Sequence, residues 1–144
     1  MKRVLLAGTA ALVVGVGLTG CSSPVTHDRL AAQFGPTFAR LYAYKQDELG
    51  QVAPPRGPDG TARCGRGGAV SGGTGAGDDW TCTVVYPFGD GHLQPITYDV
   101  TVAATGCWTA DGPSAVVGRA TISTPDGRDV LNPLFAIDGC LDVA

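Results

Sequence analysis

Residues 80–105 read WTCTVVYPFGDGHLQPITYDVTVAAT, and this stretch decides the fold. From 80 to 88, and again from 96 to 105, most even positions are aromatic or aliphatic, while threonine and aspartate fill most odd positions. A period of two is typical of a β-strand that buries one face. The intervening residues 89–92, GDGH, predict a turn. The stretch therefore predicts an antiparallel hairpin.

Further strand signals follow this hairpin. Residues 116–123 predict a third strand, residues 124–127 (TPDG) a turn, and residues 128–131 the start of a return strand. Two alternatives stay open for residues 132–139. Either Pro133 marks an edge strand, or Asn132 caps a short helix that Gly139 ends. Cys107 lies on the polar face of its strand, so a bulge at Gly106 would be needed to turn it inward, whereas a surface disulfide would need none.

A helical pattern precedes the strands, at residues 28–46. Its apolar residues share one helix face, and either Thr26 or Asp28 can cap its start. Pro36 lacks a backbone N–H, so the helix either kinks there or a second helix begins with Pro36. We expect one α+β domain at residues 26–144, with this helical segment packed on an antiparallel sheet of three to four strands. The apolar stripe consists of Leu30, Phe34, Phe38, Leu41 and Tyr42.

Glycine and proline dominate residues 50–79, between the helix and the hairpin. Residues 50–63 (GQVAPPRGPDGTAR) predict a loop, and residues 65–79 contain seven glycines. Neither a GxxxxGK[ST] phosphate loop nor a GxGxxG motif occurs in this region. The second stretch is therefore expected to be a flexible loop or a hairpin tip.

The N-terminal residues have the pattern of a targeting signal. Lys2 and Arg3 precede an apolar run at residues 4–16, which has the length of a secretory signal and is too short for a spanning helix. Residues 18–21, LTGC, follow it. They resemble the lipobox of bacterial lipoproteins. This resemblance, confined to residues 1–21, implies a signal peptide at 1–20, acylation of Cys21 by membrane lipid, and a short tether at 21–25.

Four cysteines remain once Cys21 is assigned to lipid: Cys64, Cys82, Cys107 and Cys140. An even number of cysteines in an exported domain predicts disulfides. Three pairings can be drawn, and we favour Cys64–Cys82 with Cys107–Cys140 because they close the smaller loops. A metal site is not expected, since no CxxC spacing occurs and the only histidines are His27 and His92.

Composition and motif content argue against some classes of function for this chain, namely nucleic-acid binding and GxSxG hydrolysis. The formal net charge is −3, and loss of Lys2 and Arg3 with the signal peptide would make it −5. An acidic domain without a basic patch does not favour nucleic-acid binding. No GxSxG motif occurs, and no cofactor is expected.

Two classes of function remain. We expect a non-catalytic module at the outer face of the cell membrane that binds an envelope protein, a wall component or a secreted enzyme, with Trp80 and Trp108 as candidate partner contacts. The alternative is a small extracytoplasmic enzyme around His92, with Asp90 and Asp99.

Overall fold

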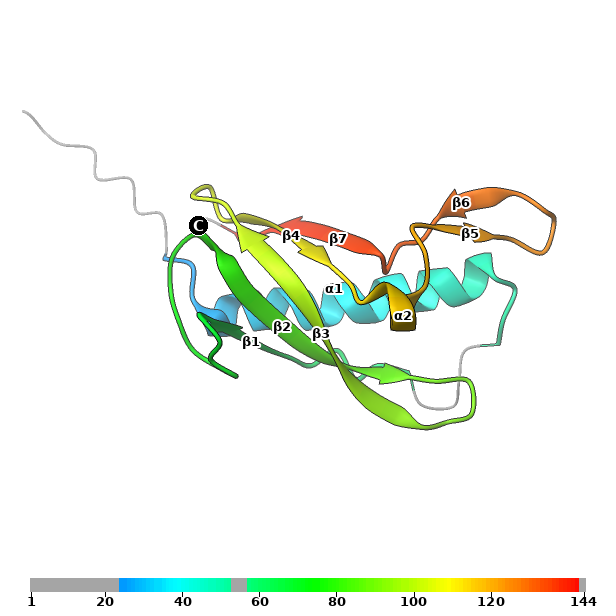
Figure 1. Cartoon of the computed structure of the whole chain (residues 1–144), viewed down its shortest axis with the longest axis horizontal. Coiled ribbons are helices and arrows are strands. Elements are labelled where there is room, and N and C mark those ends of the chain that lie inside the picture. Colours follow the sequence, from blue (N-terminus) through cyan, green and yellow to red (C-terminus); the bar gives the residue numbers. More distant parts are fainter. Residues whose placement is uncertain (1–23, 53–56, 143–144) are drawn as a thin grey trace, which may run out of the picture.

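The computed structural model of the chain describes residues 24–52 and 57–142. It shows an α+β fold in which one long helix packs on a five-stranded antiparallel sheet, beside a small two-stranded sheet (Figure 1). The α+β fold class expected from the sequence is confirmed, with five strands in the main sheet where three to four were expected. The signal peptide and Cys21 lie outside the described residues, as do residues 53–56 of the proline-rich loop.

Helix α1 spans His27–Glu48 without interruption, so the two outcomes considered for Pro36 reduce to a proline inside one helix. The hydroxyl of Thr26 caps its start by accepting a hydrogen bond from the Arg29 N–H at 3.3 Å. The backbone of Gly60 approaches the helix beside Pro36. A Cβ on Gly35 would lie 2.1 Å from the carbonyl oxygen of Gly60, so only glycine fits there.

The main sheet is formed by β1 (Ala62–Arg66), β2 (Gly77–Pro87), β3 (Leu93–Val102), β4 (Cys107–Asp111) and β7 (Ala136–Cys140). Its spatial order is β1-β2-β3-β4-β7, and each neighbouring pair is antiparallel. The predicted hairpin is β2 and β3. Its even-numbered residues from 80 to 86 and from 96 to 102 are buried, as the alternation requires.

Segments that follow the hairpin depart from the prediction. The expected strand at 116–123 is wrong in its first part, because a single helical turn, α2 (Ser114–Val117), begins after Pro113 and ends at Gly118 with φ of +93°. Only β5 (Thr121–Ser123) is extended, and it pairs with β6 (Asp129–Leu131) in the small sheet. Of the two alternatives for residues 132–139, the short helix is wrong and the edge strand forms, although it begins after Pro133 and not at it. A turn at residues 133–135 leads into β7.

Glycine-rich residues 67–76, named the glycine loop below, connect β1 to β2. This loop is a hairpin tip, as one of the two expectations had it, and hydrogen bonds hold it in place. The Arg66 N–H donates to Gly72 O at 3.0 Å, and the Gly72 N–H donates to Cys64 O at 3.4 Å. A Cβ on Gly65 would lie 1.9 Å from the carbonyl oxygen of Ala69, so glycine is required for the chain to fold back this closely.

The core lies between α1 and one face of the main sheet. Phe34 of α1 contacts the rings of Tyr98 and Trp108, with centroids 5.3 and 5.4 Å away. The two disulfides have the favoured pairing, and each joins directly opposed residues of adjacent strands. Cys64–Cys82 is buried under α1, with its two residues 1% and 0% exposed. Cys107–Cys140 faces outward, so no bulge turns Cys107 into the core.

Candidate functional site

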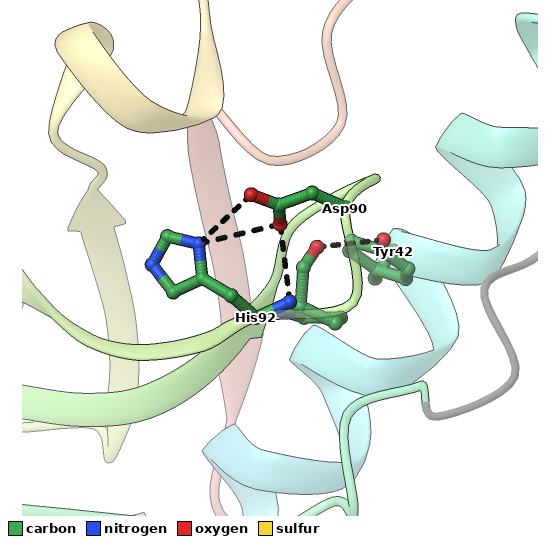
Figure 2. A network of polar contacts seen from close by, with 4 residues as sticks. Tyr42, Asp90 and His92 are labelled. Atoms are coloured by element: carbon green, nitrogen blue, oxygen red, sulfur yellow. Dashed lines mark hydrogen bonds and ion pairs between the residues drawn. The ribbon is translucent and has the colours of Figure 1, made fainter.

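The hairpin tip between β2 and β3 holds Asp90 and His92 (Figure 2). Asp90 Oδ1 accepts a hydrogen bond from the His92 backbone N–H at 3.0 Å and lies 3.3 Å from His92 Nδ1. These hydrogen bonds, from the backbone first and the ring second, lower the pKa of Asp90. The third residue of the predicted set is not brought to this place. Asp99 lies seven residues further along β3 from His92, roughly 23 Å at the rise of a strand.

A chain of aromatic rings joins this tip to the helix. The Tyr42 hydroxyl of α1 donates a hydrogen bond to Pro87 O at 3.0 Å (Figure 2). The Tyr42 and Tyr86 rings meet edge to face at 5.5 Å. Phe88 contacts Tyr86 at 5.0 Å, and its other neighbour is the His92 ring, stacked at 4.7 Å with an interplanar angle of 9°. The contacts of His92 therefore stabilise the turn.

The Asp90–His92 pair is open to water. The His92 and Asp90 side chains are 56% and 69% exposed, so no water-excluded surface surrounds them. In the described part of the chain, the His92 ring contacts the Asp90 carboxylate and the Phe88 ring, and neither partner is a hydroxyl or thiol nucleophile. Within the described residues, no group of three or more His, Cys, Asp or Glu side chains is placed to hold a metal ion.

The predicted partner contacts, Trp80 and Trp108, are core residues. They are 1% and 2% exposed, so the expectation that they meet a partner directly is corrected. Their indole N–H groups donate to Gly75 O at 3.1 Å and to Gln33 Oε1 at 3.2 Å. Each tryptophan falls on the buried parity of its strand, which is the signal that could have placed it in the core.

A groove of about 390 Å³ lies between α1 and β7, and no sequence pattern predicted it. The amide of Gln33 bridges its floor, accepting from Trp108 and donating to Cys140 O at 2.7 Å. Pro36 lines the groove and supplies no N–H to the carbonyl of Ala32, one turn earlier. The groove is lined by Ala32, Gln33, Pro36, Thr37, Arg40, Asp138, Gly139 and Cys140.

Strand β7 is an edge of the main sheet, and its outer backbone groups face this groove. The hydrogen bonds from Gly112 N–H to Phe135 O and from Leu141 N–H to Gly106 O fix the register with β4. By alternation, the peptide groups of Ala136, Asp138 and Cys140 point away from β4. Gln33 occupies the carbonyl of Cys140, which leaves the N–H and C=O of Asp138 without a strand beside them. Such an edge can pair with an extended peptide.

A buried polar cluster ties α2 and the small sheet to the end of α1. Lys45, 7% exposed, donates from Nζ to Val117 O at 2.5 Å, and burial lowers its pKa. Asn132 donates from Nδ2 to Val117 O and Arg119 O, both at 2.8 Å. Lys45 is the single lysine after residue 20, which was the one signal in the sequence that marked it. The role of this cluster is structural.

Comparison with protein-family models, with curated proteins and with solved structures gives no match to this chain. Within the described residues, no helix combines the length and the apolar character needed to cross a membrane. The assignment of a role therefore depends on the lipobox-like signal and on the geometry described above.

Proposed function

We propose that this protein is a lipoprotein of the outer face of a bacterial cell membrane, anchored through acylated Cys21, and that it acts there as a non-catalytic binding module. The observation that carries the anchoring is the place where the fold begins. Val25 is 8% exposed, and the Pro24 carbonyl accepts a hydrogen bond from Arg29 at 3.1 Å. Only Ser22 and Ser23 therefore separate the lipobox cysteine from the folded domain.

Two acyl chains suffice for stable anchoring, at about 0.8 kcal/mol for each buried methylene group. Signal cleavage before Cys21 would also remove Lys2 and Arg3 and leave the acidic chain described above. Export further agrees with the two disulfides, because they form and persist outside the cytoplasm.

Expression of the full chain in a bacterium tests the anchoring. Mass spectrometry of the mature N-terminal peptide should find Cys21 carrying acyl chains, and the protein should fractionate with membranes. Cys21→Ser should lose both properties, whereas the matched variant Ser22→Ala should keep them. A mature protein cut normally from the unaltered sequence but free of lipid would contradict the proposal.

The binding surface that the geometry supports is the groove between α1 and β7. Its edge strand offers the backbone groups of Asp138 to an extended segment, and Arg40 and Thr37 of α1 lie along the opposite wall. Arg40 is exposed on the helical wall, so the groove also offers a positive charge to a bound segment. A segment of an envelope protein in extended conformation fits this set of groups.

Photocrosslinking in intact cells tests the binding role. A photoreactive residue at Thr37, in the groove, should give one discrete protein adduct, and the same residue at Thr101, on the outer face of the sheet, should not. Equal, diffuse labelling from the two positions would argue against the groove. Adducts with wall fragments alone would assign it a wall ligand instead of a protein.

A further inference from the structure

One end of the molecule gathers the start of the fold and two loops (Figure 1). The beginning of α1, the glycine loop, the β3–β4 turn and the C-terminal end of the described chain lie together there. The end of α1, the tip of the β2–β3 hairpin and the small sheet lie at the opposite end. The chain therefore enters the fold at one pole of an elongated domain.

The glycine loop is fixed to the first folded residues. The Gly75 N–H donates to Val25 O at 2.9 Å, the His27 N–H donates to Gly73 O at 3.2 Å, and Thr26 and Thr74 form an antiparallel bridge. This loop consequently has a set position relative to Val25 and His27, where the described fold begins.

The tip of the glycine loop carries no charge of its own. Residues 67–76 read GGAVSGGTGA and contain no ionisable side chain, while the Arg66–Asp79 ion pair lies at the base of the loop, where Arg66 also donates to Thr74 O at 2.8 Å. Val70 is 77% exposed, and the hydrogen bond from Ala69 N–H to Arg66 O at 3.2 Å helps to hold the tip in its turn. Charged side chains lie at both poles: Asp28, 87% exposed, stands at the start of α1, and Asp47, Glu48, Asp90, Asp126 and Arg128 lie at the opposite end.

We propose that the glycine loop is a second membrane contact, with Val70 inserted at the headgroup boundary of the bilayer that holds acylated Cys21. This inference rests on the proposed anchoring. Three Cα steps separate Cys21 from Pro24, so the fold begins at most about 11 Å from the acylated residue. The uncharged tip around Val70 enters the membrane interface without the desolvation of an ion, while Arg66 and Asp79 stay paired at the base of the loop. The loop and the lipid together set the orientation of the domain on the membrane.

Fluorescence quenching by brominated lipids tests this orientation. The acylated Val70→Trp protein is reconstituted in phosphatidylglycerol–phosphatidylcholine vesicles whose acyl chains carry bromine. Leu131→Trp is the matched control, because Leu131 is 80% exposed and lies in the small sheet at the opposite pole. The unaltered protein gives the background of the two buried tryptophans, and Ser71→Trp repeats the measurement from the neighbouring exposed residue.

The emission added by tryptophan at position 70 or 71 should be blue-shifted on vesicles and largely lost in brominated lipid, while that at position 131 should change in neither respect. Equal quenching at the two poles, or none at either, in protein that mass spectrometry shows to be acylated would overturn the membrane contact and leave the anchoring intact. Absence of acyl chains would overturn the anchoring and this inference together.

Discussion

Removal of the two disulfides one at a time should reveal a rank order opposite to that of their loop lengths. The sequence separations are 18 for Cys64–Cys82 and 33 for Cys107–Cys140. In the chain-entropy estimate these loops correspond to about 3.2 and about 3.7 kcal/mol at 25 °C. Loop length alone therefore predicts that loss of Cys107–Cys140 destabilises the domain more.

Burial of Cys64 and Cys82 reverses the order in which loss of the two disulfides is expected to lower the free energy of unfolding. Cys64 and Cys82 lie under α1 with 1% and 0% exposure, so their replacement by alanine also removes two core sulfurs, each worth about 0.8 kcal/mol or more with its cavity. The Cys64→Ala/Cys82→Ala variant should then lose about 5 kcal/mol of unfolding free energy. Cys140 is exposed on the outer face, and Cys107→Ala/Cys140→Ala should lose about 3.7 kcal/mol.

Urea unfolding of the mature domain, followed by circular dichroism, measures the two losses. The m-values report whether either variant alters the compactness of the unfolded state, and the comparison uses the free energy extrapolated to water. Mild reductant supplies a second readout, because the outward Cys107–Cys140 bond should be reduced first. A larger loss for Cys107→Ala/Cys140→Ala, with unchanged m-values, would refute the assignment of Cys64–Cys82 to the core.

The remaining predictions concern titration and the histidine. Burial lowers the pKa of Lys45 below the 10.5 of the unfolded chain. The unfolded state therefore binds more protons at pH values between the folded-state pKa and 10.5, and the free energy of unfolding rises with pH over that range. Lys45→Met should remove this rise from unfolding curves measured between about pH 8 and 10.5. Hydrogen bonds from Thr124 and Arg128 lower the pKa of Asp126 to about 2. The contribution of the ionised Asp126 to the stability of the fold is therefore present above pH 3.8 and is lost as the pH falls toward 2. The carboxyl carbon of Asp126 should titrate near pH 2 by NMR, and Arg128→Ala should raise that midpoint; a midpoint near 3.8 in the unaltered protein would contradict the contacts. His92→Ala removes the ring stacked on Phe88 and should lower the unfolding free energy by about 0.5–1.5 kcal/mol. Loss of a cellular phenotype in a variant that remains folded would support the enzyme alternative.

Sequence periodicity predicted the elements whose pattern is long. Strands β2 and β3 are 11 and 10 residues long, and their alternation is visible without a structure. The same holds for α1, whose stripe from Leu30 to Tyr42 spans several turns. Both disulfides followed from counting cysteines and comparing loop lengths.

Short strands escaped prediction because their stability comes from distant partners. Strands β1, β4 and β7 have five residues each, and β1 and β7 contain a glycine. Cys140 pairs with Cys107 from 33 positions away, and nothing local to either strand encodes that register. The groove could not be predicted for the same reason, because its two walls, α1 and β7, lie at opposite ends of the sequence.

Helix α1 sets, by its length, the distance between the two poles of the domain. Its 22 residues correspond to about 33 Å, and it runs from the pole where the chain enters the fold to the pole that carries the hairpin tips (Figure 1). With the anchor proposed above, this length and the two-residue spacer confine the domain to a shell a few nanometres deep above the bilayer. Ligands for the distal hairpins would have to come within that shell, because the anchored domain cannot reach farther toward them.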